Sequence, residues 1–236
     1  MDSRARIHHL DTLRGFAVTL MIAYHFCFDL DYYGLIDQEF NHDHFWLTAR
    51  ALIVTLFLLV MGASLQLAHR NGIRWRAVAR RFALLAGSAA LVTLATWLLF
   101  PRSYVFFGIL HFIALASLLG LLFLHRPKWA LVGASAALLV GGFWSHPFFN
   151  ATGWQWFGLM THKPVTEDYV PLLPWFGVVL LGMVLGMASG KISVGSLPLP
   201  KNGALAWAGR HSLIIYLLHQ PLLMGLLFLV TSAGRA

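Results

Sequence analysis

The sequence is poor in charged residues, and acidic residues are the scarcest. Only 11% of its 236 residues are Asp, Glu, Lys or Arg, whereas a soluble globular domain carries about 25%. Hydrophobic residues make up 58% of the chain, and the mean hydropathy is +0.71. This composition excludes a soluble domain and predicts an integral membrane protein, in which each helical span needs about 20 apolar residues.

Cysteine is almost absent, since Cys27 is the only one and cannot form an intrachain disulfide. No Ala-x-Ala cleavage site follows the first apolar run, so we expect that run to stay in place as a signal anchor. The net charge of +8 comes from basic residues in short loops, and we find no nucleic-acid-binding motif. Nucleic acid is therefore not an expected partner.

Seven apolar segments predict an all-α fold, a polytopic transmembrane helix bundle that forms a single domain over residues 1–236. The segments cover residues 13–34, 49–69, 82–100, 106–125, 129–147, 172–190 and 209–231. A cytoplasmic N-terminus places thirteen of the 17 Lys and Arg residues inside and four outside. The positive-inside rule favours this orientation.

The first span carries ionisable residues on one narrow face. Asp11, Arg14, His25 and Asp29 fall within about 60° of one another at 100° per residue. Intramembrane ionisable residues usually line a bundle interior or cavity and indicate function. His25 is a candidate general base that Asp29, four residues on, could orient. The structural alternative is an Asp11–Arg14 ion pair with a hydrogen-bonded core histidine.

The last span has a second polar face, formed by Ser212, Tyr216 and His219 within about 60°. A hydrogen bond between Tyr216 and His219 is the better interpretation for the tyrosine. His219 is harder to explain structurally because it falls near the middle of a span.

The two larger outer loops hold further candidates. His42 and His44 flank Asp43 with a spacing that could bind a metal, but no third ligand has suitable spacing, so we expect no metal; exposed loop residues are the alternative. Glu167 and Asp168 precede Trp175 at a span entrance. Carboxylates beside aromatic rings suit a sugar or polyol, although an interfacial aromatic girdle would look the same.

The inner loop 70–81 is rich in arginine, with Arg74, Arg76, Arg80 and Arg81 among its members. This pattern fits the positive-inside rule and lipid contact, or the binding of an anionic cytosolic ligand. Gly182, Gly186 and Gly190 repeat every four residues in the sixth span, which predicts close helix packing.

Several motifs together resemble a known family. Leu-Asp-Thr-Leu-Arg-Gly-Phe-Ala from Leu10, followed by Tyr24-His25, resembles the opening of membrane acyltransferases. More closely, the chain resembles the bacterial relatives of heparan-alpha-glucosaminide N-acetyltransferase. The motifs that carry the resemblance lie at residues 10–17, 24–25, 57–64, 108–114, 168–177 and 209–221.

The resemblance implies a protein of the bacterial inner membrane that moves acetyl from cytosolic acetyl-CoA to a sugar amine or hydroxyl on the outer side. Arg14 and His25 match the arginine and histidine of the wider O-acetyltransferase pattern. The lysosomal enzyme's outer-loop histidine falls near His42 and His44, so the resemblance leaves open which histidine is catalytic.

We therefore expect acetyl-CoA, a sugar or glycan acceptor and the lipid bilayer as partners, and a homodimer is conceivable. The arginines of loop 70–81 would hold the CoA phosphates, Arg14 and Asp11 would line the inner mouth, and His219 with Tyr216 would complete the site. A transporter or channel for a small anionic or protonatable solute is the alternative function. A b-type haem protein fits poorly, because His25, His111 and His219 do not fall at one depth.

Overall fold

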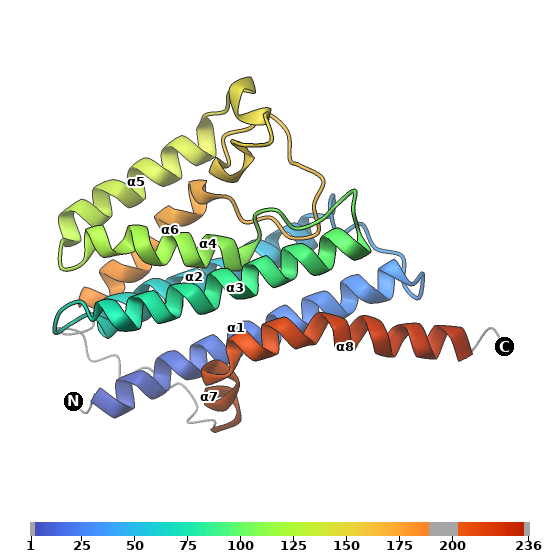
Figure 1. The fold of residues 1–236 in the computed structure, drawn as a ribbon, viewed down its shortest axis with the longest axis horizontal. Helices are drawn as coiled ribbons and strands as arrows, with labels where there is room; N and C mark the ends of the chain where they lie inside the picture. The colour runs from blue at the N-terminus through green and yellow to red at the C-terminus, as the bar shows by residue number, and fades with distance from the viewer. Residues whose placement is uncertain (1–2, 189–202, 234–236) are drawn as a thin grey trace. The chain divides into compact units, whose positions relative to one another are not determined.

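The computed structural model describes residues 3–188 and 203–233, and within these ranges the chain is helical with no strand (Figure 1). This agrees with the all-α fold predicted from the sequence. The helices are α1 (Ser3–Tyr32), α2 (His44–Ala68), α3 (Trp75–Leu99), α4 (Ile109–Gly120), α5 (Pro127–Phe143), α6 (Leu172–Ala188), α7 (Gly203–Arg210) and α8 (Ser212–Ala233). Short 3-10 turns follow α4 and lie in the loop between α5 and α6.

The chain divides into two compact units. The first contains α1, α2 up to Val60, α7 and α8; the second contains the rest of α2 and α3 to α6. In the first unit α1 and α8 lie side by side and run in the same direction (Figure 1): His25 of α1 meets His219 of α8, and Tyr33, directly after α1, meets Met224, farther along α8.

Two glycines allow α7 to pack directly on the first half of α1. A Cβ added at Gly15 would collide with the Leu205 carbonyl oxygen, and one at Gly209 would collide with the Asp11 carbonyl oxygen. The two helices therefore touch backbone to backbone, which only glycine permits at these positions. The predicted last span at 209–231 is divided here, since α7 ends at Arg210 and α8 begins at Ser212.

Small residues also bring helices together in the second unit. A Cβ added at Gly177 of α6 would lie 2.9 Å from the Ala134 carbonyl oxygen of α5, and one at Gly186 would lie 3.0 Å from the Ala63 carbonyl oxygen of α2. Gly182 is buried in α6, and Gly190 lies outside the described residues. Gly186 thus packs closely, as its spacing predicted.

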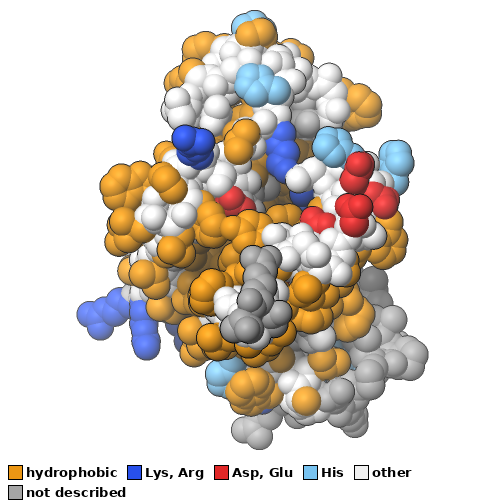
Figure 2. Space-filling view, turned by 90° about the vertical axis from the view of Figure 1, so that its right-hand side faces the viewer, with side chains coloured by type: hydrophobic (Ala, Val, Ile, Leu, Met, Phe, Trp, Pro, Cys, Tyr) orange, Lys and Arg blue, Asp and Glu red, His pale blue; other side chains and the backbone are white. Residues whose placement is uncertain are grey.

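Four of the described helices are long and apolar enough to cross a membrane: α1 from His8, α2, α3 and α8. The 17-residue helices α5 and α6 are about 26 Å long, shorter than the hydrocarbon core of about 30 Å. Every predicted span overlaps a helix, but these lengths account for four of the seven. Hydrophobic side chains cover much of the visible surface (Figure 2), as expected for a multi-pass membrane protein.

Candidate active site

Two histidines from distant parts of the chain form a hydrogen-bonded pair in the first unit. His25 of α1 and His219 of α8 are 2.8 Å apart, measured from Nδ1 to Nε2, and their ring centroids are 4.9 Å apart. His219 is buried at 8% exposure, whereas His25 keeps part of its surface accessible. The parallel course of the two helices brings both rings to the same level.

The bonding pattern fixes the position of each proton in the neutral pair. Nδ1 of His219 lies 2.7 Å from the backbone oxygen of Tyr216, which can only accept, so this nitrogen carries the proton. Nε2 of a neutral His219 then accepts a hydrogen bond from Nδ1–H of His25. Nε2 of His25 is left with its lone pair, which is the form that a general base or nucleophile requires.

Asp29 does not orient His25 as the sequence suggested; its partner is Gln220. The side-chain amide of Gln220 donates to Oδ1 of Asp29 at 2.6 Å. Asp29 is 1% exposed, and its Oδ2 has no hydrogen-bond partner among the residues that the structure describes; the same holds for the buried Oε1 of Gln220. His219 occupies the position that we had predicted for Asp29, because α8 rather than the next turn of α1 faces the imidazole.

Asp11 and Arg14 form an ion pair of 3.2 Å one turn apart on α1. This is the pair that the structural interpretation of the polar face predicted. His25 follows Asp11 by 14 residues, about 21 Å along the helix axis, so the ion pair and the histidine pair are separate features of one helix.

His42 is exposed in the loop that leads into α2, and His44 is exposed as the first residue of this helix. Asp43 between them caps this helix, since its Oδ1 accepts from the backbone N–H of Phe45 at 2.7 Å. The loop is held by aromatic contacts: Phe40 lies 5.6 Å from Tyr24 between ring centroids and 4.2 Å from Trp46. In the described part of the chain, no three His, Cys, Asp or Glu side chains gather as a metal site.

The arginines of the second unit lie at the beginning of α3. Arg74 immediately precedes the helix, and Arg76, Arg80 and Arg81 lie on its first two turns. All four are exposed. Their positions leave them accessible to an anion, and no acidic residue is present in the first turn of this helix.

Glu167 and Asp168 form hydrogen bonds to other residues of the second unit, which their sequence context did not indicate. The carboxylate of Glu167 accepts from the Ser103 hydroxyl. Oδ2 of Asp168 accepts from the backbone N–H of Ile109 at 2.8 Å and so caps α4. Trp175 lies near the beginning of α6 and is half-buried. Both carboxylates thus stabilise the loop and helix geometry, and sugar binding by these residues stays a prediction.

Gln220 is the participant that sequence reasoning missed. It follows His219 directly and lies within the motif at residues 209–221. A polar amide beside a mid-span histidine was the available signal, but its partner could not be known before the neighbour of α8 was.

The comparison with known proteins decides the family. The model of heparan-alpha-glucosaminide N-acetyltransferase, catalytic, matches residues 6–221. The chain belongs to this family. The match includes α1 with Asp11, Arg14, His25 and Asp29, and it extends through His219 and Gln220 to Pro221. No curated protein and no solved structure matches the chain.

Family membership makes the protein a membrane acyltransferase and agrees with the resemblance found in the sequence. The residues that the family model covers bring together the histidine pair and the Asp29–Gln220 pair. These two pairs are the candidate active site.

Proposed function

We propose that the protein transfers an acetyl group from cytosolic acetyl-CoA to an amine or hydroxyl of a sugar acceptor, with His25 as general base. The observation that carries the proposal is the proton arrangement of the His25–His219 pair, which leaves Nε2 of His25 able to take a proton. Family membership supplies the reaction class.

In the proposed reaction Nε2 of His25 takes the proton from the acceptor nitrogen or oxygen as that atom attacks the thioester carbonyl. The C–S bond breaks, and the departing CoA sulfur receives the proton from His25. His219 stabilises the charged imidazole through its Nε2, much as a buried partner orients a catalytic histidine in hydrolases. Direct transfer of this kind needs no acetyl-histidine intermediate. Tyr216 contributes the backbone oxygen that holds His219.

Asp29 and Gln220 are proposed to bind the acceptor. Oδ2 of the carboxylate and Oε1 of the amide are both buried hydrogen-bond acceptors, and neither has a partner within residues 3–188 and 203–233. Leaving such groups unpaired costs about 1–3 kcal/mol each, so a ligand with amine or hydroxyl donors would restore that loss on binding. A sugar offers such donors in pairs.

Arginine side chains are proposed to bind the acetyl donor, acetyl-CoA. Arg74, Arg76, Arg80 and Arg81 are exposed and suited to the phosphates of acetyl-CoA, because guanidinium groups bind phosphate through paired hydrogen bonds. Arg14, with Asp11, is proposed to line the cytoplasmic mouth of the first unit.

Seven spans with a cytoplasmic N-terminus are proposed for the topology. A chain whose first and last spans run in the same direction crosses the membrane an odd number of times, and α1 and α8 are parallel. This supports seven crossings over four and favours spanning roles for α4, α5 and α6 despite their length. Since one family model runs from residue 6 to 221, we propose a single acyltransferase domain in the bacterial inner membrane. A homodimer stays a prediction.

The test is acetyl-CoA turnover by the purified protein in nanodiscs, followed as free CoA with and without a panel of hexosamines. We expect CoA release that an acceptor stimulates. Absence of both acetyl-CoA binding and release would overturn the proposal. Solute flux through the protein in liposomes without acetyl-CoA would instead establish a transporter.

A further inference from the structure

The second unit has two open hollows that share a wall, one among its loops and one beside α3 and the start of α4. Tyr104 and Phe106, between α3 and α4, line both of them. The first, of about 290 Å³, includes the side chains of Arg102, His162 and Lys163 in its lining and is called the polar hollow; the second, of about 420 Å³, has no Lys or Arg in its lining and is called the apolar hollow. Neither contains a residue of the candidate active site.

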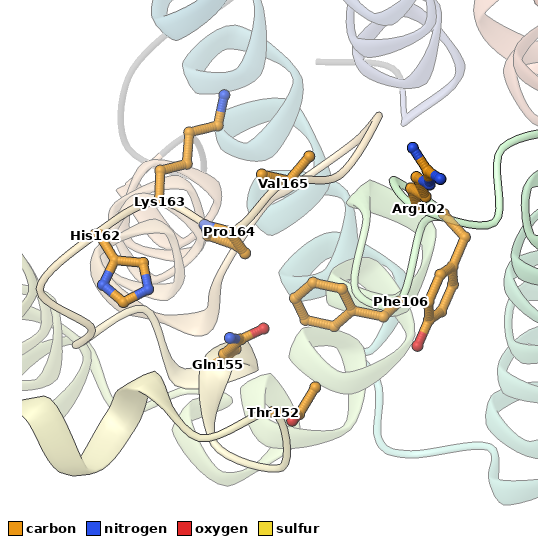
Figure 3. Close-up of a pocket in the computed structure, with 9 residues that line it drawn as sticks. Arg102, Phe106, Thr152, Gln155, His162, Lys163, Pro164 and Val165 are labelled. Atoms are coloured by element: carbon orange, nitrogen blue, oxygen red, sulfur yellow. The ribbon is translucent and has the colours of Figure 1, made fainter.

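The polar hollow is bordered by cations. Arg102 and Lys163 lie on opposite sides of it, and His162 adds a third nitrogen-bearing side chain (Figure 3). Arg102 and Lys163 are two of the four basic residues that the proposed topology places outside. The positive-inside rule does not explain cations on that side, so the presence of both in the lining of one hollow needs another reason.

Hydrogen bonds between distant segments hold the walls of the polar hollow. The Thr166 hydroxyl donates to the Tyr104 backbone oxygen at 2.8 Å, and the backbone N–H of Glu167 donates to the Ser103 backbone oxygen at 2.8 Å. The Tyr169 hydroxyl donates to the Gln155 backbone oxygen at 2.6 Å, and burial raises the pKa of this tyrosine, which therefore stays protonated. The hollow is thus built from fixed segments.

The apolar hollow extends along the last turns of α3. Ala90, Leu94 and Trp97 line it, and the last two are 53% and 54% exposed. Since α3 is a candidate span that ends at Leu99, Trp97 lies near the boundary between hydrocarbon and headgroups, a usual place for tryptophan. Ala90 precedes it by seven residues, about 10 Å deeper along the helix.

We propose that this pair of hollows binds one anionic phospholipid of the outer leaflet. The phosphate lies between Arg102 and Lys163, and an acyl chain descends past Phe106 along Leu94 and Trp97. Charge complementarity selects the anionic headgroup, and the depth of the two hollows matches the order of headgroup and chain in a bilayer. The site is independent of acetyl transfer.

The experiment uses tryptophan quenching by lipids with brominated acyl chains, added to the whole protein in nanodiscs of zwitterionic lipid. Brominated phosphatidylglycerol is compared with brominated phosphatidylcholine, without acetyl-CoA. We expect stronger quenching by phosphatidylglycerol, and the difference should vanish in Trp97→Phe. The double variant Arg102→Gln/Lys163→Gln should bind phosphatidylglycerol about 30-fold more weakly.

The matched control is Arg126→Gln/Lys128→Gln, which removes the same charge from the exposed beginning of α5 and should retain the preference. Equal quenching by the two lipids, or an unchanged preference in the Arg102 and Lys163 double variant, would overturn the proposal. So would displacement by glycerol phosphate at the same concentration, since that would indicate a site for soluble anions. Because turnover is not measured, a failure here leaves the acyltransferase proposal untouched.

Discussion

Replacing His219 by alanine tests whether this residue holds His25 in its working form. The change removes the acceptor at 2.8 Å from Nδ1 of His25 and leaves that N–H without its partner on α8. His25 itself stays in place. The imidazole is then free to rotate or to move its proton to Nε2, the nitrogen that has to act as the base.

The size of the effect follows from the lost hydrogen bond. A buried donor without its partner costs about 1–3 kcal/mol, which lowers kcat about 5- to 150-fold if the whole cost appears in the transition state. Removing the base itself in His25→Ala should cost more, about 10²- to 10⁴-fold. His219→Gln should recover part of the loss, because its Oε1 can accept from Nδ1–H of His25.

The assay is acceptor-stimulated CoA release at saturating acetyl-CoA, with Tm measured in parallel to confirm that each variant folds. We expect the order wild type, His219→Gln, His219→Ala, His25→Ala. A His219→Ala variant with wild-type kcat would show that His219 does not hold His25 in its working form. A His219→Gln variant no more active than His219→Ala would refute the assigned proton positions.

Three further predictions concern packing, the acceptor and the donor. Gly209→Ala should lower the free energy of unfolding by about 1–3 kcal/mol, because the new Cβ meets the α1 backbone. Gly203→Ala, which has open space around it, should change the free energy of unfolding by less than about 1 kcal/mol. Denaturant titration in detergent measures both variants, and equal effects would contradict the close contact. Asp29→Asn should raise KM for the acceptor about tenfold without changing acetyl-CoA binding, and steady-state kinetics with each substrate varied would expose the opposite pattern. Arg76→Gln with Arg80→Gln should raise KM for acetyl-CoA about tenfold at low salt, and an unchanged KM would remove these arginines from the donor site.

The helical architecture was predictable because apolar segments of about 20 residues have few alternatives in a membrane protein. Each predicted span overlaps a helix of the structure. The number of spans was harder to predict, since α5 and the described part of α6 are both shorter than the apolar segments predicted at 129–147 and 172–190. The break after Arg210 was missed because its neighbourhood is apolar on both sides.

Three members of the candidate site, His25, His219 and Asp29, were predictable, whereas Gln220 and the pairing of the four residues were not. His25 and His219 each stood out as mid-span histidines, yet their contact depends on α8 lying beside α1, which no local pattern encodes. Asp29 looked like the partner of His25 because residues four apart share a helix face. In the structure Asp29 is hydrogen-bonded to Gln220 instead. Asp168, which was expected to bind a sugar, accepts a hydrogen bond from the backbone N–H of Ile109.

The measurement that tests the account most directly is acceptor-stimulated CoA release by His25→Ala beside His42→Ala and His44→Ala, all in nanodiscs. We expect turnover to be lost in His25→Ala while acetyl-CoA binding persists, and we expect the His42→Ala and His44→Ala variants to remain active. Wild-type turnover in His25→Ala, or its loss in a loop variant alone, would contradict the assignment of His25 as the base.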